Sequence, residues 1–361
     1  MSSARSLAQL RTEFTRRGWK RAPTARILSE LAVHVALLAG GCVLFLCAAP
    51  MWLRGAGILL SAVGSVGITT NTHTSSHFAT NSRRWLNELL TYFGYSLCLG
   101  FSATYWWSDH IAGHHVSPNV VGKDNDFEFF PIFALTESEV SSTKGMRRAY
   151  HEKWQWIALL FAIPFMGFNL QRNGLAHILG VLRRPSGVEK QKTPSAKASE
   201  RKRCMLDLAA IVVHVLIFLV LPAALFGVGA AVTLYALRIG LTSVVMFGIL
   251  APAHFAIETP FLTPAQAAGL DHCELQSFTT IDFEGGPLLR WLASGLEYQI
   301  EHHLFPEISH TYYPRMSPLV KEFCEARGLP YRVYGFRRAL HESILAFRTP
   351  KRIGIGAISL G

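Results

Sequence analysis

Charged residues and paired cysteines are both scarce in this chain, and each shortage argues against a class of protein. Only 16% of the 361 residues are charged, against roughly 25% in an ordinary soluble domain. The six cysteines include no Cys-x-x-Cys pair, so a small disulfide-bonded scaffold is excluded and we expect reduced, packed cysteines. Half of the residues are hydrophobic, which excludes an intrinsically disordered chain.

Long apolar runs account for the hydrophobic content. Residues 31–49 contain no charge and are long enough to cross a bilayer as a helix. A second run covers residues 55–70, and a third, residues 208–253, is long enough for two spans and a tight turn. The sequence therefore predicts an all-α integral membrane protein with four transmembrane helices in two hairpins. Residues 86–107 and 154–168 are predicted to lie as helices at the membrane interface. The alternative is that these segments are core helices of a large soluble protein.

The net charge of +11 is explained by orientation in a membrane, and no nucleic acid partner is expected, because of where the basic residues lie. They cluster before the first apolar run, after the second and before the third, whereas the two tight loops carry only Arg54. By the positive-inside rule, both hairpins enter from the cytoplasm and both termini are cytoplasmic. The amino terminus shows no signal peptide. Arg238 falls inside the fourth span, where a charge is costly and is expected to be paired or to snorkel.

These features divide the chain into five segments, and residues 190–199 are interpreted as a flexible cytoplasmic loop. The predominance of arginine over lysine is typical of GC-rich genomes and suggests a bacterial cytoplasmic membrane. The segments are a basic amino-terminal part (residues 1–26), a first hairpin (27–82), a cytoplasmic and interfacial region (83–205), a second hairpin (206–256) and a cytoplasmic carboxy-terminal region (257–361).

Seven of the fifteen histidines fall into three tight clusters. Residues i and i+4 share one face of a helix, so each of the first two clusters is predicted to present two imidazoles in one direction. All three clusters lie on the predicted cytoplasmic side, each near the end of an apolar run, where one site can form from all of them. They are, in chain order, His73 and His77; His110, His114 and His115; and His302 and His303.

The number of clustered imidazoles indicates more than one metal ion. Neutral imidazole is the commonest side-chain metal ligand at physiological pH. Seven or eight are too many for one tetrahedral zinc ion, which takes four ligands. They suit two metals of higher coordination with open positions, and imidazole is compatible with iron.

These clusters resemble the histidine boxes of the integral-membrane fatty acid desaturase family. The likeness covers about residues 30–335 and is most specific at the third box, where Gln299 stands in the place of the first histidine of other desaturases. This substitution is the hallmark of the front-end and sphingolipid-type branch. The other stretches that match this branch are residues 105–107, 114–126 (HHVSPNVVGKDND), 276–282 (QSFTTID), 295–306 (GLEYQIEHHLFP) and 317–331.

The resemblance implies a di-iron centre that activates O2 with two external electrons and turns a saturated acyl segment into a cis alkene. The seven clustered histidines would be its ligands, with His254, at the end of the last span, as an eighth. Metal-bound imidazoles also need acceptors that fix their tautomers. Candidates for this role beside the boxes are Gln299, Asp109, Asp124, Asp126, Glu297 and Glu301. Trp106 and Trp107 are candidates for lining a substrate tunnel or for anchoring at the interface.

The sequence departs from the family pattern in three places. The first box reads HTSSH and lacks the usual acidic residue, no asparagine accompanies His254, and no cytochrome b5 domain precedes the first span. We therefore expect electrons to come from a separate protein of the ferredoxin or cytochrome b5 type. The substrate is expected to be an acyl-lipid, an acyl-CoA or an acyl carrier protein. The chain length and the bond position stay open.

Two other functions are compatible with some of these features. A hydroxylase or an acetylenase (a triple-bond-forming enzyme) of the same family would use the same oxidant, and the sequence does not separate these from a desaturase. A metal transporter would need polar ligands near the middle of the bilayer. The histidine clusters lie at span ends, which disfavours the transporter.

Overall fold

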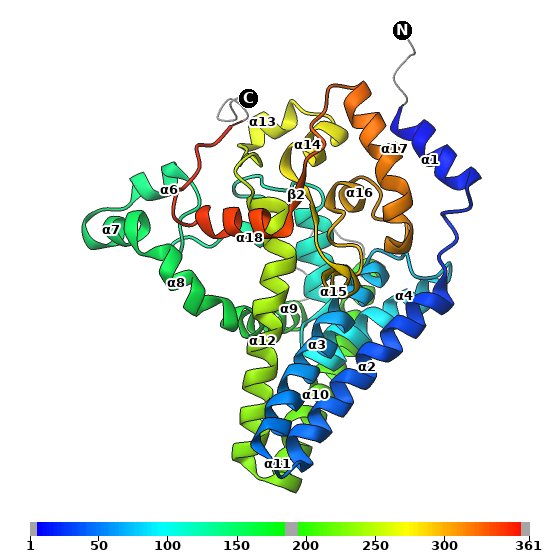
Figure 1. The fold of residues 1–361 in the computed structure, drawn as a ribbon, viewed down its shortest axis with the longest axis vertical. Helices are drawn as coiled ribbons and strands as arrows, with labels where there is room; N and C mark the ends of the chain where they lie inside the picture. The colour runs from blue at the N-terminus through cyan, green and yellow to red at the C-terminus, as the bar shows by residue number, and fades with distance from the viewer. Residues whose placement is uncertain (1–5, 185–193, 355–361) are drawn as a thin grey trace. The chain divides into compact units, whose positions relative to one another are not determined.

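The computed structural model describes residues 6–184 and 194–354. These residues are mostly helical, and two short strands pair in parallel (Figure 1). The described residues form two compact units. The hairpin unit contains residues 24–108, 163–184 and 194–245, and the histidine unit contains residues 6–23, 109–162 and 246–354.

The α-helices are α1 (Leu7–Arg16), α2 (Thr24–Cys47), α3 (Met51–Ser76), α4 (Arg84–Thr91), α5 (Ala103–Trp106), α6 (Glu137–Ser142), α7 (Gly145–Lys153), α8 (Gln155–Ala162), α9 (Met166–Arg183), α10 (Pro194–Val215), α11 (Leu221–Phe226), α12 (Val228–Phe255), α13 (Pro264–Ala268), α14 (His272–Thr279), α15 (Pro287–Ala293), α16 (Gln299–Leu304), α17 (Tyr313–Ala326) and α18 (Phe336–Leu345). The π-helices are η1 (Tyr92–Leu99), η2 (Trp107–His114) and η5 (Leu216–Val220), and the 3₁₀ turns are η3 (Asn125–Phe127), η4 (Ile163–Phe165) and η6 (His310–Tyr312). The strands are β1 (Asp282–Glu284) and β2 (Val333–Gly335).

Among the described residues, four helical segments are long and apolar enough to cross a membrane, which confirms the predicted number of spans. They are Thr24–Cys47, Met51–Ser76, Ala198–Phe226 and Val228–Phe255. The third consists of α10, the π-turn η5 and α11 in succession. At the turn into the fourth, Gly227 has a φ of +88°, a conformation that residues with a side chain rarely adopt.

The prediction of a flexible loop over residues 190–199 is wrong for its second half. Residues 194–199 belong to α10, whereas residues 190–193 lie outside the described part of the chain. Pro194 opens the helix, where its missing N–H has no intrahelical partner to lose. The segments at 86–107 and 154–168 are helical but broken into shorter pieces, and their place at the membrane interface stays a prediction.

Glycines let α2 and α3 approach each other closely within the hairpin unit, where the two helices run side by side (Figure 1). A Cβ atom on Gly41 would lie 2.6 Å from the carbonyl oxygen of Gly57, and one on Gly64 would lie 2.6 Å from that of His34. In a bilayer, apolar surface gives little driving force for helix association, so close backbone packing of this kind stabilises the pair.

A buried carboxylate connects α10 to the segment that enters α5. Asp207 is fully buried and accepts hydrogen bonds from the hydroxyls of Ser96 (2.5 Å), Ser102 (2.7 Å) and Thr104 (2.6 Å). The backbone N–H of Thr104, in the first turn of α5, also donates to it at 2.9 Å. A buried carboxylate is tolerated only when such donors replace its lost hydration, so Asp207 fixes these two segments against each other.

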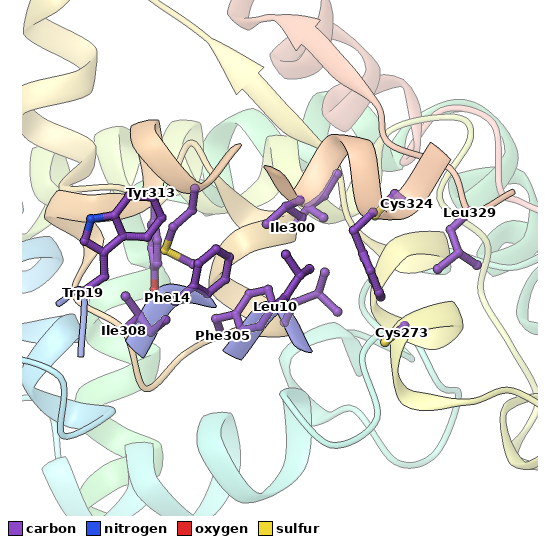
Figure 2. Close-up of a cluster of buried hydrophobic side chains, with 14 residues drawn as sticks. Leu10, Phe14, Trp19, Cys273, Ile300, Phe305, Ile308, Tyr313, Cys324 and Leu329 are labelled. Atoms are coloured by element: carbon purple, nitrogen blue, oxygen red, sulfur yellow. The ribbon is translucent and has the colours of Figure 1, made fainter. Parts of the chain in front are cut away.

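The histidine unit has its own apolar core, built from α1, α14, α16 and α17 (Figure 2). Phe14 of α1 contacts the ring of Phe305, just after α16, edge to face at 4.9 Å between centroids. Ile300 of α16 and Met316 of α17 are fully buried in the same cluster. This core holds in place the short helix α16, which carries the third histidine box. All six cysteines are free, and four of them are buried as predicted, but the prediction of a packed residue is wrong for Cys47, which is exposed.

A test of the hairpin packing compares two adjacent glycines. We expect Gly41→Ala to lower the free energy of unfolding by about 1–3 kcal/mol, because the added methyl group forces the α2 and α3 backbones apart. Gly40→Ala is the matched control, since a Cβ there meets no atom within 4 Å and alanine is the better helix former. The measurement is the thermal midpoint of each variant in detergent. Equal midpoints for the two variants would show that the close approach is not stabilising.

Candidate metal centre

The second histidine box lies on a π-helix rather than on an α-helix. Within η2 the turn is wide enough for the N–H of His115 to bond the carbonyl oxygen of His110, five residues earlier, at 3.0 Å. The expectation of an α-helix here is therefore wrong, but the rings of His110 and His114 still stack 5.0 Å apart, as expected of two imidazoles that point in one direction. The ring of His110 also lies 4.9 Å from the ring of His115, and His114 belongs to a further group with His254 and His303. Single π-turns inside helices are frequent at functional sites.

The first group of imidazoles in the histidine unit consists of His110, His115 and His302. One ring nitrogen from each lies within 4.8 Å of the others, and all three side chains are buried. The Nε2 atoms of His115 and His302 are only 3.1 Å apart. At this distance two imidazole nitrogens repel each other unless one of them donates a hydrogen bond to the other. A cation bound between them would remove the repulsion in the same way.

The second group consists of His114, His254 and His303. Their ligand nitrogens again lie within 4.8 Å of one another, and the ring of His114 is 4.6 Å from that of His254. His254 is buried near the end of α12, and its Nδ1 has no hydrogen-bond partner. An orphaned buried nitrogen costs free energy unless something binds it, so this donor set fits a metal ion.

Acceptors on the Nδ1 side set the tautomers of three of these rings. Nδ1 of His114 lies 2.8 Å from a carboxylate oxygen of Asp124. Carboxylate oxygens only accept, so Nδ1 must carry the proton, and in the neutral ring Nε2 keeps its lone pair. The same argument holds for His303 with the amide oxygen of Gln276 at 2.7 Å, and for His110 with Asp126 at 2.8 Å when the Asp126 carboxyl is ionised. Each ring thus offers Nε2 as a metal ligand, the usual arrangement of metal-bound histidines.

Further contacts hold the acceptors themselves. The backbone N–H of Asn119 donates to Asp124 at 2.8 Å, and its side-chain amide donates to the carbonyl oxygen of His254 at 3.1 Å. Gln276 donates from its amide nitrogen to the carbonyl oxygen of His115 at 3.0 Å. Sequence reasoning did not single out the roles of Asn119 and Gln276. Both lie in the quoted family stretches, and this was the only signal that could have identified them.

Burial and charge perturb the groups around His114. The side chain of Asp126 is 29% exposed, and its partial desolvation, reinforced by the carboxylates of Asp124 and Asp109, raises its pKa to about 7, although His114 acts in the opposite direction. Burial on its own would lower the pKa of His114, but the Asp124 carboxylate outweighs it and the net pKa is raised. The pocket therefore favours positive charge at His114. A metal ion bound there competes with a proton and releases it.

The remaining acidic candidates lie in other contacts. Asp109 accepts a hydrogen bond from the side chain of Asn125 at 2.7 Å. Glu301 accepts one from the hydroxyl of Tyr331 at 2.7 Å, and the same hydroxyl lies 2.9 Å from Asp282. Burial and the neighbouring Asp282 raise the pKa of Glu301 well above its ordinary value, so this buried pair holds a proton. The pairing of β1 with β2 brings the chain around Tyr331 to Asp282.

Two further candidates are buried next to the third box. Gln299 is the first residue of α16 and is buried. Glu297 is 5% exposed, and its Oε2 has no hydrogen-bond partner. Burial raises the pKa of Glu297 to about 7, with Arg290 acting weakly against it. The carboxyl group of Glu297 is therefore protonated and uncharged over most of the pH range below 7.

The first histidine box lies in the hairpin unit. His73 belongs to the last turn of α3, and His77 is the C-cap of that helix, with the two rings 4.8 Å apart. Trp106 contacts His73 edge to face at 5.8 Å. The indole N–H groups of Trp106 and Trp107 donate to the hydroxyl and the carbonyl oxygen of Ser76, respectively. Both tryptophans therefore support the end of α3, and their predicted role in a tunnel stays a prediction.

Comparison with known proteins agrees with this chemistry. The family model described as "Fatty acid desaturase" matches residues 50–335. The chain is 29% identical over 301 residues to the sn-1 linoleoyl-lipid 6-desaturase of Synechocystis sp. (strain ATCC 27184 / PCC 6803 / Kazusa), covering 79% of this chain and 76% of that protein. The corresponding protein of Arthrospira platensis is 26% identical over 298 residues, with coverages of 79% and 74%. The Delta(5) fatty acid desaturase fat-4 of Caenorhabditis elegans is 27% identical over 285 residues, which are 76% of this chain but only 59% of that longer protein.

Removing an acceptor should weaken metal binding without removing a ligand. We expect Asp124→Asn and Gln276→Leu each to lower iron affinity about 10- to 100-fold, because the partner imidazole loses the contact that fixes its tautomer. The measurement is the iron content of the purified protein after a graded chelator challenge, by plasma mass spectrometry. Asp109→Asn is the control, since Asp109 is engaged with Asn125. Wild-type iron retention in both test variants would show that these acceptors do not orient the ligands.

The buried Glu297 should make stability depend on pH. Its pKa in the folded chain, about 7, lies above the unfolded value of about 4.3, so the wild type loses stability as pH rises from about 4 to about 7. Glu297→Gln removes this loss, and its advantage over the wild type should grow by up to about 3 kcal/mol across that window. Thermal midpoints at pH 5 and pH 8 measure the effect, with the exposed Glu284→Gln as the control. An advantage that does not change with pH would contradict the assignment.

Proposed function

This chain belongs to the fatty acid desaturase family, and from that membership we propose that it introduces a cis double bond into an acyl chain with O2 and two donated electrons. It has four helices suited to a membrane and buried histidine clusters consistent with a di-iron site. The observation that carries the proposal is the pair of three-histidine groups whose acceptors leave Nε2 lone pairs for a metal.

We propose two iron ions as the cofactor. His110, His115 and His302 supply ligands to one ion, and His114, His254 and His303 supply ligands to the other. Six imidazoles, three of which have an oxygen acceptor on Nδ1, suit iron in a coordination that keeps positions open. On the motifs of the family alone, His73 and His77 are proposed as further ligands.

Bound iron would supply the oxidising power to break an unactivated C–H bond, which no side chain provides. The role of this chain is to orient the histidine ligands of the iron ions. Asp124, Asp126 and Gln276 keep protons on the Nδ1 atoms, so the rings stay neutral toward the ion. The position of the new double bond then depends on how the protein holds the acyl chain relative to the centre. Trp106 and Trp107 are proposed to contribute to that positioning.

An acyl-lipid is the substrate that we propose, because the cyanobacterial relatives carry linoleoyl-lipid in their names. Acyl-CoA and acyl carrier protein substrates are the alternatives for the assay. The electrons are proposed to come from a donor of the ferredoxin or cytochrome b5 type. The basic residues around the spans support the proposal that both termini lie in the cytoplasm. The predominance of arginine over lysine supports a bacterial cytoplasmic membrane.

Expression in a bacterial host tests the reaction. We expect total fatty acids from cells that make the wild-type chain to contain a new cis alkene, located by gas chromatography and mass spectrometry of double-bond adducts. His114→Ala and His303→Ala should reduce the product at least 100-fold, because each removes a proposed ligand. The exposed His341→Ala, on α18, is the matched control and should keep the wild-type yield.

The products also separate the rival functions. New hydroxy or acetylenic fatty acids in place of an alkene would replace the desaturase proposal with a hydroxylase or an acetylenase. An unchanged profile in a host that supplies both electron donors and all three acyl carriers would contradict acyl-chain chemistry altogether.

A further inference from the structure

Arg238 is a buried cation in the fourth candidate span, and its charge is not neutralised by any described ion pair. Its side chain is fully buried, 0% exposed. Nη1 donates to the hydroxyl of Ser65 at 3.2 Å and to the carbonyl oxygen of Cys98 at 3.1 Å, both neutral acceptors. Nη2 has no hydrogen-bond partner. Within residues 6–184 and 194–354, no carboxylate forms a salt bridge with it.

Aromatic rings give the guanidinium partial compensation. Its central carbon lies 4.3 Å from the ring centroid of Phe218 and 5.5 Å from that of Tyr235. A desolvated cation–π contact contributes on the order of 2 kcal/mol. The free energy of placing an arginine in the middle of a membrane span exceeds this contribution on every published scale. The ring contacts therefore do not fully compensate the charge, and the described environment of Arg238 lacks an anion.

A cavity adjoins the arginine. It has a volume of about 360 Å³, and Arg238 is the only charged residue among those that line it. The other walls are apolar and come from α2, η1, η5, α11 and α12, all within the hairpin unit. The lining continues to Leu46 and Phe226, which lie beside the turns of the two hairpins. Val228 and Arg238 are ten positions apart, which corresponds to roughly 15 Å along α12.

We propose that this cavity binds a free long-chain fatty acid, with the carboxylate on Arg238 and the alkyl chain along the apolar walls. A carboxylate is a planar group that only accepts hydrogen bonds, and it matches the unused donors of Nη2 in charge and geometry. Because Arg238 is fully buried, the ring of Phe218 that covers the guanidinium must move aside for the carboxylate to reach Nη2. The volume is at the lower end of the range for small-molecule sites, which suits one alkyl chain better than the two chains of a phospholipid. No box histidine lines the cavity, so this proposal does not depend on the desaturase reaction.

Photocrosslinking to the purified full chain in a non-ionic detergent tests the site. The probes are palmitic acid with a diazirine in its alkyl chain and the matching hexadecanol, which carries no charge. We expect the acid to label peptides containing residues 35–46 and 217–226 at least tenfold more than the alcohol does. Arg238→Gln should abolish this preference, and Arg238→Lys should restore part of it, because lysine keeps the charge but not the planar fork.

A second pair of variants leaves the arginine in place, in case Arg238→Gln does not fold. Cys42 lines the cavity, so Cys42→Phe fills it and should reduce labelling of both peptides about tenfold. Ala36→Phe is the control, because Ala36 is exposed on the same helix and is not a lining residue. Variants are compared only when they elute as monodisperse protein.

Three results would overturn the proposal. Equal labelling by acid and alcohol would mean that the cavity takes alkyl chains without using the charge. Undiminished labelling in Cys42→Phe would place the ligand elsewhere. The third result is a difference between two unlabelled competitors. If lysophosphatidic acid removed the label and excess palmitate did not, the ligand would be a lipid phosphate instead of a fatty acid. Competition by unlabelled palmitate supports the proposal.

Discussion

The hydrogen bond between His114 and Asp124 is the interaction on which the candidate centre depends. A buried imidazole can bind a metal only if its proton is held on the opposite nitrogen, and a carboxylate at 2.8 Å holds it there. Asp124 is itself fixed by the backbone of Asn119, whose side chain also supports the end of α12 at His254. One short network therefore sets both the tautomer of one ligand and the backbone position of another.

The rest of the histidine unit supports this network by packing. The π-helix η2 carries His110, which groups with His115 and His302, and His114, which groups with His254 and His303, while the rings of His110 and His114 stack 5.0 Å apart. The apolar core around Ile300 and Phe305 fixes α16, where the consecutive residues His302 and His303 also belong to different groups. Adjacent residues on a helix point about 100° apart, so a doublet serves two sites when its helix is held rigidly.

The hairpin unit shows how polar groups are tolerated among apolar helices. Close glycine contacts bring α2 and α3 together, and hydroxyl and amide donors surround the buried carboxylate of Asp207. Arg238 differs from Asp207, because its described partners are neutral acceptors and ring faces. Satisfied polar groups stabilise such a bundle, whereas an uncompensated charge indicates a ligand.

The sequence by itself determined the four spans, the three histidine boxes and the family, because long apolar runs and closely spaced ligands are local patterns. It also determined that Asp124 and Asp126 lie near box histidines, since they follow the second box closely in the chain. Only the tertiary structure decided that η2 is a π-helix, that Gln276 bonds His303, and that His254 lies beside His114. These contacts join residues up to 140 positions apart. They depend on packing between helices, which no local spacing encodes, and the cavity at Arg238 depends on the same kind of packing.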